Sequence, residues 1–146
     1  MSHKIKSIVG IMAIGLVAFA SCKKKSDDSA KAKLTGKWKT TKVATDVNSN
    51  GSMDATEVFT LPDSVSSYVT FNADGSGSSQ GVATGSTSVS LTWKLINSDK
   101  DIVITEGGSS DTAHIESLNS TDLEISDNSD NGMGGTTKGW VFLHKQ

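Results

Sequence analysis

The sequence predicts an all-β domain: a small eight-stranded antiparallel barrel of the up-and-down type, preceded by a leader segment and a flexible tether. From Leu34 onward the chain has a single proline and is rich in Gly, Ser, Thr, Asn and Asp, which favour turns. Short segments of alternating apolar and polar residues recur about every ten residues, a spacing typical of antiparallel β-proteins. No segment beyond Leu34 shows the 3.6-residue period of a long helix.

The first 21 residues are predicted to be a signal peptide. Lys4 and Lys6 precede the apolar run "SIVGIMAIGLVAFA", which is too short to span a bilayer as a permanent anchor. The run ends in "AFASC", which contains the only cysteine, Cys22, and resembles a bacterial lipobox. The resemblance implies that Cys22 begins the mature chain and carries a diacylglycerol and an acylated amine, with acyl chains such as palmitate. The alternative is a secreted protein with a free thiol.

Residues 22–33 are predicted to be a solvated tether, because "KKKSDDSAKAK" has no apolar periodicity. A lipid on Cys22 places the chain in the cell envelope, as an outer-membrane lipoprotein on the periplasmic face or the cell surface. The mature chain keeps 12 of 14 lysines and all 16 acids, so 12 − 16 gives a formal charge of −4. This balance argues against nucleic acid as a partner.

The remaining residues, 34–146, form the predicted barrel domain. Its clearest strand is "STSVSLTWKL", in which Val89, Leu91, Trp93 and Leu95 fall on one face. The predicted strands cover residues 36–43, 67–72, 77–83, 86–95, 101–105, 112–118, 122–126 and 139–145. Residues 127–135 are predicted to be the loop before the last strand. Closure of the meander would bring the first strand beside the last, and Trp38 beside Trp140.

Several segments resemble the small lipocalin-like lipoproteins of the Bacteroidota: "LTGKW", "YVTFNADGSG", "TWKL" with "DIVIT", "IESLNSTDLEI" and "GWVFLHK". Gly36, Lys37 and Trp38 match the G-x-W element of lipocalins, which implies that Trp38 closes one end of the barrel. The resemblance implies a non-enzymatic protein that binds a small apolar ligand inside the barrel. The expected lining residues are Trp38, Phe71, Leu91, Trp93, Ile104, Ile115 and Phe142. The alternative is a structural or protein-interaction lipoprotein whose barrel is filled by those same side chains.

The stretch "DVNSNGSMDATE" satisfies the pattern D-x-[DN]-x-[DN]-G-x5-E and resembles the calcium loop of EF-hand proteins. The expected ligands of Ca²⁺ are Asp46, Asn48, Asn50, Ser52, Asp54 and Glu57, with Gly51 at the sharp turn. The flanking segments alternate like strands, so the loop is expected to order the connection between the first two strands. Only three of the ligating side chains are charged, which predicts a weak structural site with a dissociation constant of about 0.1–1 mM. A polar surface turn without metal is the alternative.

No catalytic constellation is expected. Ser79 lies in "GSSQG" but in a hairpin, without the strand-turn-helix context of a nucleophilic serine. His114 and His144 lie on predicted strands, and neither belongs to a metal-ligand spacing. The protein is therefore predicted not to be an enzyme.

Overall fold

The computed structural model describes residues 28–81, 86–130 and 135–146, so the predicted leader and Cys22 lie outside the described residues. A short helix, α1 (Ala30–Leu34), precedes the first strand, and a single 3₁₀ turn, η1 (Ala55–Glu57), precedes the second. The strands are β1 (Gly36–Thr45), β2 (Val58–Thr60), β3 (Tyr68–Phe71), β4 (Ser76–Gln80), β5 (Val89–Ile96), β6 (Asp101–Glu106), β7 (Ser109–Leu118), β8 (Asp122–Asp130) and β9 (Thr136–Lys145).

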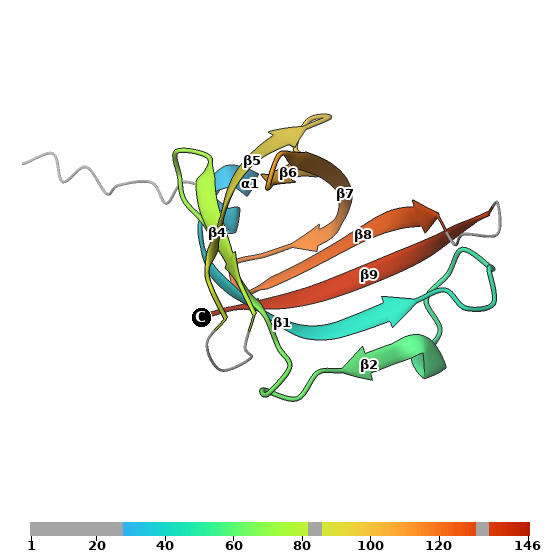
Figure 1. The fold of residues 1–146 in the computed structure, drawn as a ribbon. Helices are drawn as coiled ribbons and strands as arrows, with labels where there is room; N and C mark the ends of the chain where they lie inside the picture. The colour runs from blue at the N-terminus through green and yellow to red at the C-terminus, as the bar shows by residue number, and fades with distance from the viewer. Residues whose placement is uncertain (1–27, 82–85, 131–134) are drawn as a thin grey trace, which may run out of the picture.

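All strand pairs are antiparallel, and from β3 to β9 each strand pairs with the next in the chain (Figure 1). β1 pairs with β3 along one edge and with β9 along the other, from Trp38↔Lys145 to Thr45↔Gly139. Eight strands thereby close into a barrel, while the short β2 pairs with the second half of β1. This confirms the predicted fold and the predicted contact of the first strand with the last.

Three local expectations were wrong. The predicted loop 127–135 begins as strand, because β8 continues to Asp130 and stays paired with β9 out to Asp130↔Thr136. Trp38 and Trp140 are not neighbours, since Trp38 pairs with Lys145 and Trp140 with Ala44 at the other end of the ladder. The last residues of the predicted tether form α1, whose Leu34 is fully buried. Leu34 therefore docks the end of this segment onto the domain.

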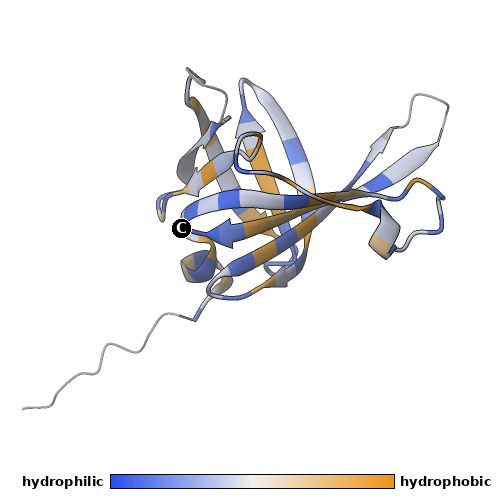
Figure 2. Ribbon diagram, turned by 90° about the horizontal axis from the view of Figure 1, so that it is seen from below, coloured by the Kyte–Doolittle hydropathy of each residue, from blue (hydrophilic) through white to orange (hydrophobic). Residues whose placement is uncertain are grey.

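The alternating pattern forms strands because it gives most of them an apolar inner face, and Figure 2 shows hydrophilic and hydrophobic residues alternating along the ribbons. On β5, Leu91 and Trp93 are buried while Thr92 and Lys94 are exposed. The Trp93 ring packs edge-on against Phe71 at 5.4 Å between centroids. Gly77 on β4 is needed here, because a Cβ would lie 2.2 Å from the Thr70 carbonyl oxygen and 2.7 Å from Leu91. The core therefore depends on a close approach of backbone to side chain.

The core fills the end of the barrel that lies beside α1, which we call the α1 end. Trp38 is fully buried there, and its Nε1 donates a hydrogen bond to the Leu34 carbonyl oxygen at 2.7 Å. The Lys145 Nζ lies 5.1 Å from the centre of the Trp38 ring and donates to the Lys33 carbonyl oxygen. The opposite end, where β1 and β6 finish and β7 and β9 begin, is called the distal end.

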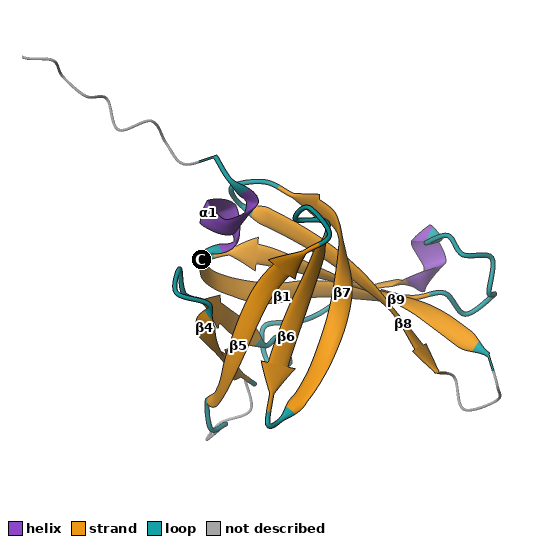
Figure 3. Cartoon of the chain, turned by 90° about the horizontal axis from the view of Figure 1, so that it is seen from above, coloured by secondary structure: helices purple, strands orange, loops and turns teal. Residues whose placement is uncertain are grey.

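The barrel wall divides toward the distal end. The β7–β8 ladder stops at His114↔Ser126, whereas β8 continues beside β9 to Asp130. The first residues of β7 pair only with β6. The β8–β9 hairpin consequently extends away from β6 and β7 together with the end of β1 (Figure 3).

Candidate functional site

The residues predicted to line a ligand site lie mostly in the packed core. Trp38, Phe71, Leu91 and Trp93 are each at most 5% exposed, and their contacts with one another belong to a single cluster. Ile104 and Ile115 are partly buried and pack against this cluster. The α1 half of the barrel is therefore filled by side chains.

A cavity of about 180 Å³ lies beyond this core, toward the distal end. Its apolar lining comes from four neighbouring strands: Ile104 of β6, Ala113 of β7, Ile125 of β8 and Val141 of β9. Strand alternation places these side chains on the inner face, because each shares its face with a core residue. Of the seven predicted lining residues, only Ile104 lines this cavity.

The divided wall explains why the cavity lies where it does. Ala113 and Ser126 flank the point at which β7 and β8 separate, and both line the cavity. Ala113 fills little of the space between the strands because its side chain is small. The sequence indicates two of the lining residues, since Ile125 alternates with Leu123 and Val141 with Leu143. The end of the β7–β8 pairing had no sequence signal.

Two carboxylates complete the lining of the cavity. Asp111 is opposite Ile104 across the β6–β7 ladder, and Asp127 is opposite Gly139 across the β8–β9 ladder. Both residues are exposed at the distal side of the cavity. The site therefore combines an apolar interior with an acidic rim.

Phe142 does not face the barrel interior, contrary to expectation. It alternates with the core residue Leu143 and with Val141, and its cross-strand partners are Lys42 and Glu124. The prediction that Phe142 lines the barrel was wrong. Phe142 is a larger apolar residue than Val141, but the register places Val141 inward. Phe142 lines a shallow depression of about 270 Å³ on the outside of the barrel.

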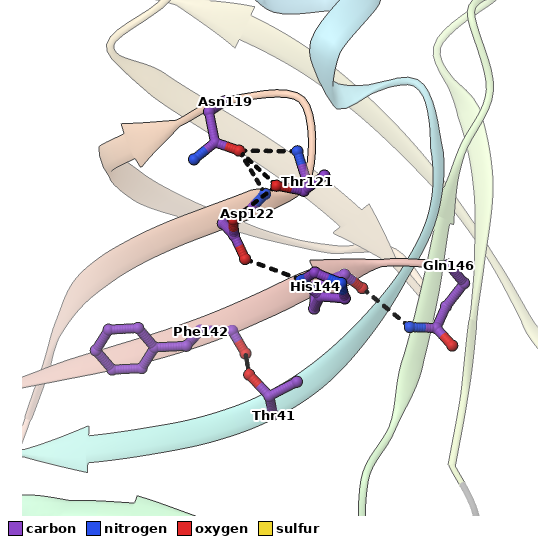
Figure 4. A network of polar contacts seen from close by, with 7 residues as sticks. All are labelled: Thr41, Asn119, Thr121, Asp122, Phe142, His144 and Gln146. Atoms are coloured by element: carbon purple, nitrogen blue, oxygen red, sulfur yellow. Dashed lines mark hydrogen bonds and ion pairs between the residues drawn. The ribbon is translucent and has the colours of Figure 1, made fainter.

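Polar contacts surround this outer depression (Figure 4). The His144 Nδ1 lies 2.9 Å from an Asp122 carboxylate oxygen, and this hydrogen bond, aided by one from Thr121, holds the pKa of Asp122 below its usual range. The other histidine, His114, also pairs with a carboxylate. Hydrogen bonds from Asn97 and then from His114 lower the pKa of Asp101. Both imidazoles are about half exposed, at 50% and 52%. Such exposed pairs contribute little to stability.

The loop from Asp46 to Glu57 is held by its own carboxylates. Asp46 accepts hydrogen bonds from the backbone N–H groups of Asn50 and Gly51 at 3.1 and 2.8 Å. Glu57 accepts from those of Val47 and Asp54, both at 3.0 Å. Asp46 and Glu57 are 4% and 3% exposed, although the loop between them is largely exposed. Gly51 has φ +77°, as the sharp turn requires.

The other predicted ligands of this loop also lie within it. The side-chain amides of Asn48 and Asn50 donate to one oxygen of Asp54 at 2.8 and 3.2 Å, while Ser52 donates its backbone N–H to the Asn50 side chain. Across residues 28–81, 86–130 and 135–146, no three His, Cys, Asp or Glu side chains come close enough together to hold a metal ion. Any cation held by this loop would therefore rely on amide and carbonyl oxygens besides carboxylates.

No helix in the described ranges has the length and apolar character needed to cross a membrane.

The fold was compared with solved structures. A solved lipocalin-like protein from Bacteroides uniformis superposes with a TM-score of 0.53 at 16% identity, covering 78% of this chain and 99% of that chain. The bovine lipocalin allergen Bos d 2 gives a TM-score of 0.46 at 14% identity, covering 80% and 75%. A deswapped triple mutant of bovine odorant binding protein gives 0.45 at 15%, covering 78% and 74%.

At the level of sequence, no curated protein matches the chain significantly. The family model described as "Lipocalin-like domain" matches residues 34–125, which is more than half of the chain. The match runs from Leu34 to Ile125, and so covers β6, β7 and the start of β8 among the four strands that line the cavity. The chain belongs to the family of lipocalin-like domains.

Proposed function

We propose that this lipocalin-like protein binds a small apolar ligand in the cavity at the distal end of the barrel, and that it acts without catalysis. The observation that carries the proposal is the cavity itself, lined by Ile104, Ala113, Ile125 and Val141. An eight-stranded barrel is either filled by side chains or holds one small ligand. Here the α1 half is filled and the distal half retains space, which favours the binding protein over the fully filled structural barrel.

The size of the cavity limits the ligand. An apolar protein cavity of about 150 Å³ accepts a benzene molecule. A volume of about 180 Å³ therefore accommodates one ring or a short chain.

Benzene binding by Ala113→Ile tests this proposal. The larger side chain fills the cavity, so we expect benzene to shift the methyl resonances of Ile104 and Ile125 in the wild type and not in the variant. Val103→Ile is the matched control, since Val103 alternates with the inward Ile102 and Ile104 and does not line the cavity. Benzene binding of equal strength to wild type and Ala113→Ile would refute the assignment of the site.

We also propose a weak structural calcium site in the loop from Asp46 to Glu57. The support is the full match to a calcium-loop pattern together with two buried carboxylates, Asp46 and Glu57, that bracket the loop. The oxygen ligands would come from Asp46, Asn48, Asn50, Ser52, Asp54 and Glu57. Glu57 could bind the ion through both of its carboxylate oxygens. The ion would order the connection between β1 and β2.

Calorimetric titration with calcium tests this site. We expect binding at about 0.1–1 mM. The variant Asp46→Asn, Glu57→Gln keeps hydrogen-bond acceptors for the loop but removes both charges, so affinity should fall at least about tenfold. Asp63→Asn, in the following loop, serves as the control. If both variants and the wild type release equal heat on titration with calcium, the loop is a polar turn that binds no calcium.

Finally, we propose that Cys22 carries lipid and anchors the protein in the outer membrane, on the periplasmic face or the cell surface. The support is the leader and "AFASC", which lie outside the described residues. The described chain begins beside α1, and the residues that line the cavity lie toward the other end of the barrel.

A further inference from the structure

The two carboxylates on the cavity rim have no partner of opposite charge among the residues that the structure describes. Asp111 and Asp127 both line the cavity, and strand alternation puts both on the inner face with Ala113 and Ile125. Among the described residues, neither side chain takes part in a hydrogen bond or an ion pair. Their charges are therefore available to a ligand.

The inner wall at the distal end carries a third acid. Glu106 shares the inner face of β6 with Ile104, and it accepts a hydrogen bond of 2.8 Å from the hydroxyl of Ser79 on β4. Because β5 lies between β4 and β6, this hydrogen bond spans β5 on the inner side of the barrel. The acids are thus distributed around the wall and not confined to one strand.

The lysines near the distal end face outward. Lys138 donates to Glu116 at 2.7 Å and lies 5.0 Å from the centre of the Trp140 ring, on the outer face. Lys42 pairs with the outward Phe142, and Lys145 is at the α1 end. The sequence contains no arginine. In the part of the chain that the structure describes, the ionisable groups on the inner wall around the cavity are therefore all acidic.

A rim of one sign selects ligands by charge. Close to an apolar wall the effective dielectric constant is lower than in water, so the rim repels carboxylates and attracts ammonium groups more strongly than it would in bulk solvent. A hydrogen bond from an ammonium to a carboxylate is also stronger than one between neutral groups.

From this charge complementarity we infer that the cavity binds a small apolar amine, with its ring or short chain among Ile104, Ala113, Ile125 and Val141 and its ammonium group at Asp111 and Asp127. The inference rests on the proposed binding function and specifies the chemical class of the ligand. It sets this barrel apart from one that carries fatty acids, whose carboxylates the rim would exclude.

The test compares three probes with the same hexyl chain: hexylamine as its ammonium ion, hexanol and hexanoate. Residues 22–146 with Cys22→Ser are titrated at pH 7, and the methyl resonances of Ile104, Ile125 and Val141 report binding in the cavity. We expect hexylammonium to bind about tenfold more tightly than hexanol, and hexanoate about tenfold more weakly. The double variant Asp111→Asn, Asp127→Asn should reduce the preference for the ammonium ion to about twofold or less.

Asp99→Asn, in the turn between β5 and β6 at the α1 end, is the control and should leave the preference unchanged. Equal binding of hexylammonium and hexanol, or tighter binding of hexanoate, would overturn the inference while supporting the apolar cavity as a binding site. If no probe shifts the three methyl groups, the proposed function fails and the inference with it. The comparison of probes on the wild type stands even if the double variant does not fold.

Discussion

Glu124 is a carboxylate at a position that disfavours its negative charge. It lies on the outer face of β8, half-buried beside Phe142 in the outer depression. Burial, and secondly the charge of Glu116, raise the pKa of Glu124. Glu116 avoids the same cost, because hydrogen bonds from Lys138 and then Ser126 hold its pKa below the usual range. Adjacent carboxylates thus have opposite pKa shifts because only one has a cation as partner.

Replacement of Glu124 by Gln is expected to stabilise the protein at neutral pH by about 0.5 kcal/mol. Because folding raises the pKa of Glu124, the folded state favours its protonated form, and ionised Glu124 lowers stability at pH 7. The gain from Gln should disappear as the pH falls below about 4.5, where the carboxyl is protonated in both states. Urea unfolding at pH 7 and at pH 3.5 measures this. A Gln variant that is less stable than the wild type at pH 7 would contradict the explanation.

At the scale of elements, α1 acts as a plug although it has only five residues. A helix this short is not stable in isolation, so it forms here because Leu34 packs against the core and Ser29 accepts a hydrogen bond from the backbone of Ala32. Its last turn also supplies the acceptors for Trp38 and Lys145. The chain leaves the domain at α1, so the plug lies between barrel and tether.

Leu34→Ala should lower the free energy of unfolding by about 2–4 kcal/mol, because it removes a fully buried side chain from the core. Lys31→Ala, an exposed position on the same helix, should change it by less than about 0.5 kcal/mol. Urea denaturation followed by tryptophan fluorescence reports both values. Equal stability of the two variants would show that the helix is a detached part of the tether.

At the scale of the whole molecule, the barrel has two dissimilar halves. The α1 half is packed by large side chains, of which Trp38, Ile102 and Leu123 are almost fully buried. The distal half loses the β7–β8 ladder beyond Ser126, and here the lining residues are smaller and the rim is acidic. The packed core therefore lies at the α1 end, and the proposed binding cavity lies at the distal end.

The sequence by itself determined the strand pattern, the order of the meander and its closure. Alternation every second residue defines the inner face of β5, and turn residues between strands fix antiparallel neighbours. It could not determine which residue of "WVFL" faces inward, because both faces of β9 carry apolar side chains. Only the tertiary structure decided that. It also decided that α1 docks and that β7 and β8 separate at Ser126, which creates the cavity and brings Asp111 and Asp127 to its rim. Local periodicity records burial along one strand, whereas the length of a ladder depends on how two distant strands twist and diverge.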